Sequence, residues 1–346
     1  AHLAAMAGPL AVGFVGLGSM GGKMAANLAA KVCAAEAASA ASRTGSLAGR
    51  RLWLHDVRPA VADGVLSGLG ARAPGHVRAA ASLGELASEC RQGVVLLCLP
   101  GRREVIETVD GLVPHLSSDA LVVDCSTCGA EAARAAAEAL RSGPGASFLD
   151  APVTGAPARA ATGTLTVMTG GEVQHLDRAR PLLETFATKV LHVGDTPGSG
   201  QLAKAFNNCL YNISVAAMAE MLPLAKRTGL DLEPLMEVVS SGTGQSFGFD
   251  QWAEKALQRE FEAPRHGYPM GSAFKDFETL AAAVEASGLG SLPPVLAAAR
   301  GTYQRALDMG LADEHKGAMI KVWEEELGVS CRRSEAGGAG PGPRDP

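Results

Sequence analysis

The feature that most constrains the fold of this chain is a glycine-rich segment near its start, Gly16-Leu17-Gly18-Ser19-Met20-Gly21. A short apolar run at residues 10–15 precedes it and predicts a buried strand, and residues 20–30 follow it with helical spacing. A GxGxxG segment between a strand and a helix is the context in which this motif binds a dinucleotide. The first glycine permits the tight turn, the second lets backbone N–H groups approach a pyrophosphate, and the third lets the helix pack on the sheet.

The rest of the first half predicts a parallel sheet covered by helices on both faces. Its apolar runs are continuous rather than alternating, and longer stretches of helical character separate them. Strands buried on both faces show this pattern. The runs lie at residues 52–56, 94–99, 121–124 and 148–150. The predicted fold class is therefore α/β of the Rossmann type, with a doubly wound, mainly parallel sheet.

The pattern changes where Pro197 and Gly198 interrupt it. Residues 202–227 carry apolar side chains at every third or fourth position, which predicts one long helix that stops near Gly229. Strong periodicity from there to residue 327 is helical, so an all-α domain should follow, joined through the long helix. The predicted division is an N-terminal extension (1–9), a dinucleotide-binding domain (10–195) with an insertion (31–50), a helical domain (196–329) and a disordered tail (330–346).

An acidic residue at the end of the second strand is the next expected part of a dinucleotide site, where it binds the ribose hydroxyl groups. Asp56 occupies this place, about 40 residues after Gly16 and roughly twice the usual distance away. The Ala-, Ser-, Arg- and Gly-rich residues 31–50 account for the excess if they form a surface insertion. A carboxylate here repels the 2′-phosphate of NADP, so Asp56 favours NAD, whereas Arg58 keeps NADP open as the alternative.

Composition excludes several classes of protein. The chain of 346 residues has 31 Lys and Arg against 36 Asp and Glu, without a dense basic stripe, so we expect no nucleic-acid partner. No apolar run approaches the ~20 residues of a membrane helix, so we expect no membrane partner. Seven scattered cysteines are typical of a reduced intracellular protein, cytoplasmic or in the mitochondrial matrix. Cys125 and Cys128 form a CxxC pair without a second ligand pair at zinc spacing, so we predict no metal site.

Four segments resemble the β-hydroxyacid dehydrogenase family, which includes 3-hydroxyisobutyrate dehydrogenase. The resemblance spans about residues 12–325 apart from the insertion, and it implies a Rossmann domain, a long connecting helix and a helical domain. Its motifs are more specific than GxGxxG alone. They are the cofactor signature GLGxMGxxMAxNL at residues 16–28, the substrate motif DAPVSGG at residues 150–156 continued by residues 163–168, the catalytic GxGxxxKxxNN at residues 198–208, and a later segment that begins with Lys275 and Asp276.

This resemblance implies reversible hydride transfer between a short 3-hydroxy acid, such as 3-hydroxyisobutyrate, and its semialdehyde or keto form, with NAD preferred and NADP as the alternative. The alcohol also loses a proton, so an acid/base group is required. In the family pattern Lys204 is this catalytic group. Asn208 lies one turn further along the same helix face and orients the substrate. The expected substrate-binding residues are Ser126, Thr154, Gly155, Ala156 and Asn207.

The chain departs from the family pattern at two positions of the substrate motif. Thr154 replaces serine and keeps the hydroxyl group, and Ala156 replaces the second glycine and is followed by Pro157. Alanine disfavours a positive φ, and proline has no N–H to offer, so these changes bear on substrate preference. The expected cofactor-binding residues are Gly16, Leu17, Gly18, Ser19, Met20, Gly21, Asp56, Leu99, Pro100, Thr127 and Lys275.

Several alternatives share parts of this pattern. The sequence does not rank the 3-hydroxyisobutyrate activity firmly against an NADPH-dependent glyoxylate/succinic semialdehyde reductase or a threonate-type dehydrogenase. 6-Phosphogluconate dehydrogenase carries His where this chain has Asn207, and imine reductases usually lack the lysine that Lys204 supplies. A non-catalytic NAD-binding reader or assembly protein would have a degraded site, whereas Lys204, Asn208 and the glycine loop are intact. Relatives often assemble through the long helix, which implies a homodimer or homotetramer.

Overall fold

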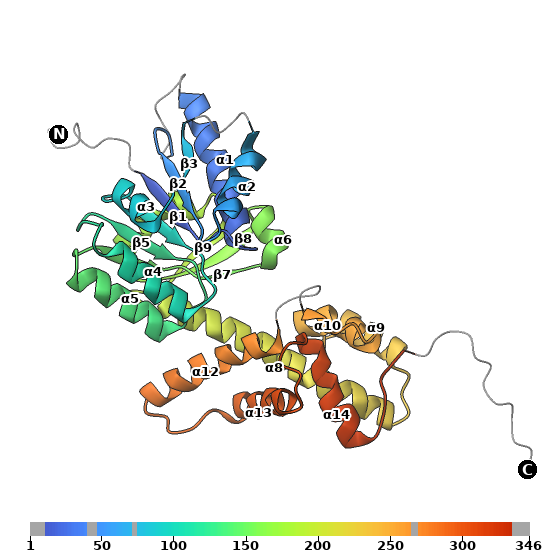
Figure 1. The fold of residues 1–346 in the computed structure, drawn as a ribbon. Coiled ribbons are helices and arrows are strands. Elements are labelled where there is room, and N and C mark those ends of the chain that lie inside the picture. The colour runs from blue at the N-terminus through green and yellow to red at the C-terminus, as the bar shows by residue number, and fades with distance from the viewer. Residues whose placement is uncertain (1–10, 40–46, 71–74, 264–268, 334–346) are drawn as a thin grey trace, which may run out of the picture. The chain divides into compact units, whose positions relative to one another are not determined.

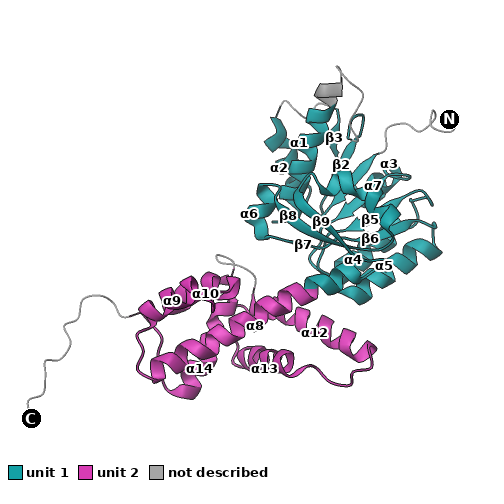
Figure 2. Ribbon diagram, turned by 180° about the vertical axis from the view of Figure 1, so that it is seen from behind, with its two compact units in different colours: residues 1–204 teal, residues 205–346 magenta. Residues whose placement is uncertain are grey.

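The computed structural model describes residues 11–39, 47–70, 75–263 and 269–333. The chain forms two compact units, Ala1–Lys204 and Ala205–Pro346 (Figure 2). The boundary between them lies inside a long helix, whereas the sequence predicted it between residues 195 and 196. The predicted N-terminal extension (1–9) lies outside the described residues, as do residues 40–46 of the predicted insertion and residues 334–346 of the predicted tail.

The first unit is built around a sheet that has nine strands within the described residues (Figure 1). Six of them are parallel and follow the order β3-β2-β1-β4-β5-β6. This is the order of doubly wound dinucleotide-binding folds, so the predicted fold class is confirmed. These strands are β1 (Val12–Val15), β2 (Leu52–His55), β3 (Val77–Ala79), β4 (Val94–Leu97), β5 (Leu121–Asp124) and β6 (Ser147–Asp150).

Helices cover both faces of this sheet (Figure 1). Side chains of α1, α2, α6 and α7 pack with Phe14 and Leu96 on one face, and those of α3, α4 and α5 pack with Val15 and Leu97 on the other. Neighbouring residues of a strand point to opposite faces, which is why the runs are apolar at every position. The first five helices are α1 (Gly21–Ser39), α2 (Pro59–Leu69), α3 (Leu83–Glu89), α4 (Arg102–Leu112) and α5 (Ala130–Ser142).

The sequence did not predict the strands at the far end of the sheet. There β8 runs antiparallel to β6 and β7 and parallel to β9. β7 has only two residues, and most side chains of β9 are exposed, so neither strand has a continuous apolar run. The segments are β7 (Val153–Thr154), α6 (Ala156–Ala161), β8 (Leu165–Gly170), α7 (Val173–Leu183) and β9 (Ala187–Gly194).

The surface insertion predicted at residues 31–50 is wrong for its first part, which belongs to helix α1. The helix continues to Ser39, and Val32 is only 1% exposed in the core beside the sheet. Alanine is the strongest helix former but adds little apolar periodicity, so an Ala-rich helix gives a weak pattern in sequence. The first part of the predicted insertion is therefore a continuation of the cofactor helix rather than a surface loop.

The second unit is helical in its described part, as predicted. Its core contains Trp252, Phe277, Tyr303 and Met319. No helix in the described ranges combines the length and apolar character that a membrane span requires. The helices are α8 (Ser199–Arg227), α9 (Leu232–Ser241), α10 (Phe247–Leu257), α12 (Met270–Ala286), α13 (Pro294–Asp308), η2 (Lys316–Met319) and α14 (Ile320–Leu327).

The disordered tail predicted from residue 330 is wrong for its first residues. Cys331 is 1% exposed, and its N–H donates to Glu324 Oε1 at 2.6 Å. The guanidinium of Arg333 contacts Glu233 and Glu254, each at 2.6 Å. These residues therefore belong to the packed helical unit. The Gly- and Pro-rich composition that suggested disorder is concentrated after them.

Candidate active site

The turn after β1 shows which of its glycines the protein itself requires. Gly16 has a φ of +89°, and a Cβ there would overlap the carbonyl oxygen of Cys98. A Cβ on Gly21 would overlap the carbonyl oxygen of Gly16, whereas one on Gly18 would meet nothing within 4 Å. Among the described residues, the N–H groups of residues 18–20 donate to no protein acceptor. This open backbone at the start of α1 fits a pyrophosphate, so the loop suits the predicted dinucleotide.

Asp56 is tied directly to this loop. Its Oδ2 accepts the N–H of Leu17 at 2.8 Å, and its Oδ1 accepts the N–H of Arg58 at 3.0 Å. Burial alone would raise the pKa of the Asp56 carboxyl, but these hydrogen bonds and the Arg58 guanidinium outweigh it and lower the pKa. The side chain of Arg58 is 69% exposed, with its Nε 3.5 Å from Asp56. An ionised carboxylate therefore stands at the end of β2, where a ribose would bind.

The carboxyl ends of β1 and β4 meet beside the same loop. Leu99 follows β4, and its Cδ2 would lie 2.9 Å from a Cβ on Gly16. Pro100 and Thr127 are exposed after β4 and β5. The strand order reverses between β1 and β4, and dinucleotides bind at such a reversal. Three predicted cofactor residues therefore lie at the edge of the sheet where the cofactor is expected.

Ser126 has contacts within the protein. Its Oγ accepts the N–H of Leu99 at 2.8 Å, its own N–H donates to Asp124 Oδ1 at 2.9 Å, and it is 3% exposed. Burial raises the pKa of the Asp124 carboxyl, opposed by the hydrogen bonds from Ser126 and from the Cys128 thiol. These bonds join the ends of β4 and β5. The substrate-binding role of Ser126 stays a prediction, and the exposed side chain at this turn is that of Thr127.

The start of α8 is bound to the ends of β5 and β6. Asp150 ends β6 and is fully buried; its Oδ1 accepts the N–H of Gly198 at 2.7 Å and its Oδ2 that of Gln201 at 2.9 Å. Burial, together with the nearby Asp124 carboxyl, raises the pKa of Asp150 to about 7, although these two hydrogen bonds lower it. Gln201 Nε2 in turn donates to Ser126 O at 2.8 Å. The first turn of α8 is therefore held on the carboxyl edge of the sheet.

The predicted catalytic residues follow on the same helix. Lys204 and Asn208 are both half-buried and one turn apart on α8, whereas Asn207 is exposed. In the second unit, Asn208 Nδ2 donates to both carboxylate oxygens of Asp276, each at 3.1 Å. Asn207 Nδ2 donates to Asn208 Oδ1 at 3.2 Å. The orientation of the Asn208 amide is thus set by a carboxylate on α12, next to the exposed Lys275.

The substrate motif forms a strained turn. Gly155 has a φ of +135°, and Ala156, which follows it, has a φ of +59°. The sequence predicted that alanine would be unfavourable here, and the backbone is indeed in the region that favours glycine. Thr154 lies in β7, paired with Thr166. Asn27 of α1 donates to Ala160 O at 2.9 Å and so ties the cofactor helix to the helix after this turn.

Comparison with known families agrees with this geometry. Residues 11–194 match the family model described as the NAD binding domain of 6-phosphogluconate dehydrogenase. Residues 198–323 match the model described as NAD-binding of NADP-dependent 3-hydroxyisobutyrate dehydrogenase. The first match ends at residue 194 and the second begins at residue 198, just before α8. The predicted end of the first domain, residue 195, lies between them.

Curated relatives match most of the chain. A 3-hydroxyisobutyrate dehydrogenase of Pseudomonas aeruginosa is 35% identical over 244 residues, 69% of this chain and 72% of the relative. A 2-(hydroxymethyl)glutarate dehydrogenase of Eubacterium barkeri is 31% identical over 329 residues, 92% of this chain and 96% of the relative. The chain belongs to the β-hydroxyacid dehydrogenase family. The crystal structure of a 3-hydroxyisobutyrate dehydrogenase from Salmonella typhimurium superposes with a TM-score of 0.71 at 27% identity, covering 90% of this chain and 99% of that one.

Two residues of this β-hydroxyacid dehydrogenase gained a role that the sequence analysis did not assign. Asp150 and Gln201 lie inside the quoted motifs, but their contacts with α8 and the strand ends join residues 48 to 75 positions apart. Asp276 was named only as the neighbour of Lys275. In the sequence, each of these residues is only a polar residue in a largely apolar pattern. Such a pattern suggests a buried hydrogen bond but does not identify the residue that makes it.

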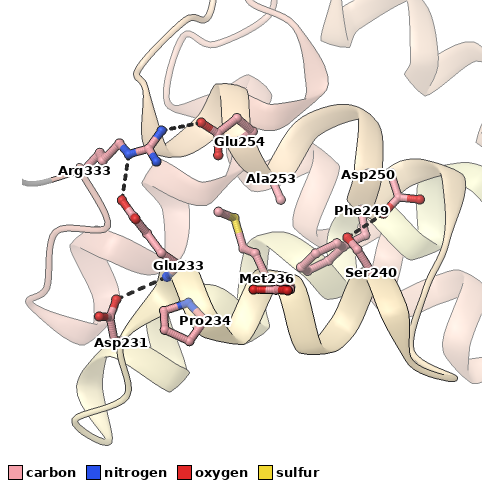
Figure 3. A pocket seen from close by; sticks show the side chains of 11 residues that line it. Asp231, Glu233, Pro234, Met236, Ser240, Phe249, Asp250, Ala253, Glu254 and Arg333 are labelled. Atoms are coloured by element: carbon pink, nitrogen blue, oxygen red, sulfur yellow. Dashed lines mark hydrogen bonds and ion pairs between the residues drawn. The ribbon is translucent and has the colours of Figure 1, made fainter.

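A cavity in the second unit and two buried thiols lie apart from the predicted site residues. A cavity of about 590 Å³ lies between α9, α10 and Arg333, lined largely by carboxylates such as Glu233, Asp250 and Glu254 (Figure 3). None of its lining residues is a predicted site residue. Cys125 and Cys128 are buried free thiols. Across the described ranges, no group of three or more His, Cys, Asp or Glu side chains is arranged to hold a metal ion.

Proposed function

We propose that this protein is an NAD-preferring dehydrogenase of short 3-hydroxy acids, in which Lys204 is the general acid/base. Membership of the family makes it an NAD(P)-dependent oxidoreductase that acts on a CH–OH group. The observation that carries the assignment of Lys204 is its place on α8. Asp150 at the end of β6 accepts the N–H groups of Gly198 and Gln201 at the start of α8, and Gln201 also contacts Ser126. Lys204 lies three residues after Gln201 on this helix.

The chemistry requires one hydride and one proton to leave the alcohol. A bound NAD would supply its nicotinamide ring as the acceptor of the hydride. Lys204, as the neutral amine, accepts the hydroxyl proton in oxidation, and as the ammonium it returns the proton to the carbonyl oxygen in reduction. Asn208 orients the reacting oxygen, since its amide is fixed by Asp276. Gly16 to Gly21, Leu99, Pro100, Thr127 and Lys275 would bind the cofactor.

The substrate carboxylate is assigned to the turn at Thr154, Gly155 and Ala156. Thr154 offers a hydroxyl group, and backbone N–H groups in a positive-φ turn suit an anion. Relatives named for 3-hydroxyisobutyrate and 2-(hydroxymethyl)glutarate support a short hydroxy acid. A further relative is named as an L-threonate dehydrogenase, so the substrate test includes the threonate-type and the reductase activities.

The preference for NAD is carried by Asp56. Its carboxylate is ionised and accepts the N–H groups of Leu17 and Arg58, so it can receive ribose hydroxyl groups but repels a 2′-phosphate. The Arg58 side chain, exposed and only loosely paired with Asp56, is the group that would admit NADP.

A homo-oligomer formed through α8 is also part of this proposal. The helix carries Phe206, Leu210 and Met221, which are 59%, 69% and 49% exposed, at helical spacing on its surface. An apolar stripe of this length suits a second copy of the same helix better than water. The free thiols support a reducing compartment, the cytoplasm or the mitochondrial matrix.

The test is a survey of turnover by absorbance at 340 nm. Hydroxy acids (3-hydroxyisobutyrate, threonate, glycerate, 4-hydroxybutyrate and 3-hydroxypropionate) are offered with NAD and with NADP. Glyoxylate, succinic semialdehyde and tartronate semialdehyde are offered with the reduced cofactors. We expect turnover of a short 3-hydroxy acid with a higher kcat/KM for NAD. Tight binding of NADH without turnover of any compound would contradict the proposal and favour a non-catalytic NAD-binding protein.

A further inference from the structure

We propose that Asp150 is a positioning residue for the reaction: it places Lys204 by fixing the first turn of α8 on the sheet. The inference rests on the proposed function, because Lys204 is the group that is placed. Asp150 itself need not touch the substrate or the cofactor. Its contribution is to the geometry of the proton transfer.

The contact is made to groups that a helix leaves unsatisfied. The first N–H groups of a helix have no acceptor within the helix. Asp150 accepts one of them, from Gln201, and also the N–H of Gly198 directly before the helix, with a different carboxylate oxygen for each. Two bonds to two oxygens fix the orientation of the helix start as well as its distance from β6. A side chain with one oxygen would leave one of these two N–H groups without an acceptor at its present position.

The surrounding backbone leaves this turn little room to shift. A Cβ on Gly200 would lie 2.5 Å from Met168 O and 2.8 Å from Asp150 Oδ2. A Cβ on Gly170 would lie 2.5 Å from Gly200 N. The glycines therefore let the helix start approach β8 and Asp150 closely, and this approach puts Asp150 within hydrogen-bond distance of the N–H groups.

Gln201 forms the second part of the attachment. Its Oε1 accepts the N–H groups of Cys128 at 3.1 Å and Gly129 at 3.2 Å, and its Nε2 donates to Ser126 O. Lys204 lies three residues further along, so its Cα moves with this turn. A displacement of about 1 Å at the reacting groups can cost on the order of 100-fold in rate.

The test is Asp150→Asn, which keeps the size of the side chain. An amide has one oxygen, so one of the two N–H groups loses its acceptor and faces an NH₂ group. We expect kcat to fall on the order of 10- to 100-fold while the Kd for NADH changes less than about twofold. If this variant does not fold, Asp150→Ser is the second variant, with the same expected split between kcat and cofactor affinity.

Thr169→Val is the matched control. Thr169 is fully buried on β8, and its Oγ1 donates to Leu191 O at 3.1 Å, away from α8. This control loses one buried hydrogen bond and should keep both kcat and NADH affinity. Unchanged kcat in Asp150→Asn, or an equal loss of kcat and NADH affinity, would overturn the positioning role.

A double-mutant cycle separates this inference from the proposed function. If Asp150 acts through Lys204, Asp150→Asn adds little further loss to the residual rate of Lys204→Ala. Full additivity would overturn the positioning role of Asp150 while leaving the role of Lys204 intact. Wild-type turnover in Lys204→Ala would instead contradict the proposed function.

Discussion

Helix α8 contacts a buried carboxylate in each unit, and the two contacts differ in how the charge is balanced. In the first unit, Asp150 accepts backbone N–H groups, and its neighbour across the strands is another buried carboxyl, Asp124. In the second unit, Asp276 accepts the Asn208 amide, and Lys316 lies close enough that the two charges act on the Cys209 thiol in opposite directions. The first contact brings two acids together, and burial raises the pKa of both, whereas the second places a lysine near the acid.

The second cluster is built around a buried lysine. Lys316 is 8% exposed, its Nζ donates to Asn212 Oδ1 at 2.6 Å, and it lies 4.3 Å from the centre of the Tyr211 ring. Tyr303 also donates to Asn212 Oδ1, at 3.3 Å. A buried ammonium needs this set of partners, because desolvation otherwise favours its neutral form.

The two contacts of α8 should therefore respond differently to pH and to substitution. The Asp150 contact depends on an acid whose pKa is about 7, and on glycines that permit close approach. The Asp276 contact depends on a balance of opposite charges in a packed core. Changes that break the first should affect turnover most, and changes that break the second should affect stability most.

Among the changes at these two contacts, Gly200→Ala is expected to have the largest combined effect on stability and turnover. The added Cβ would lie 2.5 Å from Met168 O and 2.8 Å from Asp150 Oδ2, so the start of α8 must move off the sheet. We expect a stability loss of about 3 kcal/mol and a fall in kcat on the order of 100-fold. Urea unfolding and steady-state kinetics measure both.

Gly301→Ala is its control, because a Cβ at Gly301 in α13 meets nothing within 4 Å. The same substitution in this helix interior should stabilise by about 0.5–1 kcal/mol. Equal behaviour of the two variants would show that the close approach at Gly200 does not matter.

Lys316→Met should break the charge balance of the second cluster. It removes the buried ammonium and leaves Asp276 without the opposing charge near Cys209. We expect the free energy of unfolding to fall by about 3 kcal/mol, with the Kd for NADH retained. Denaturant unfolding tests this, and a loss below about 0.5 kcal/mol would contradict the balance of charges.

The stability of the first unit should depend on the ionisation of Asp150. Its pKa is about 7 in the folded protein against an ordinary value of 3.8, so the folded form holds a proton that the unfolded chain releases. The stabilisation is fully present below about pH 4 and is lost as the pH rises through about 7. Asp150→Asn removes this dependence, so its Tm relative to wild type should rise over this interval.

Thr169→Val should instead shift Tm by the same amount at each pH, since it removes no titrating group. A constant Tm difference between Asp150→Asn and wild type would contradict the raised pKa.

Ala156→Gly should have the smallest effect and the opposite sign. Ala156 has a φ of +59°, where a side chain costs ~1–2 kcal/mol, partly offset by the larger entropy that glycine loses on folding. We expect a gain of about 0.5 kcal/mol in unfolding free energy. Ala158→Gly, two residues further along α6, should lose about 1 kcal/mol of unfolding free energy. Similar values for both variants would contradict the strain at Ala156.

Local patterns predicted the sheet core and the glycine loop well. The runs at Val94 and Leu121 became β4 and β5, since strands buried on both faces are apolar at every position. The glycine loop has a strict backbone requirement, so its place between strand and helix was sufficient. The Ala-rich continuation of α1 was missed because alanine leaves no clear apolar face.

Long-range polar contacts could not be predicted in the same way. Asp150 contacts Gly198 and Gln201 across 48 and 51 residues, and nothing in the local pattern specifies that pairing. Lys316 is separated from Asn212 by 104 residues, and a single lysine in a helical pattern normally indicates an exposed side chain. The motifs therefore predict Lys204 as the acid/base, and the fold shows which contacts hold the start of its helix in place.

The most direct test of this account is the comparison of turnover and cofactor binding in Lys204→Ala. We predict that kcat falls on the order of 100- to 10,000-fold while the Kd for NADH, measured by calorimetry, stays within about twofold of wild type. Lys189→Ala, an exposed lysine on β9, serves as the control and should keep full turnover. Wild-type kcat in Lys204→Ala would contradict the assignment of Lys204 as the acid/base.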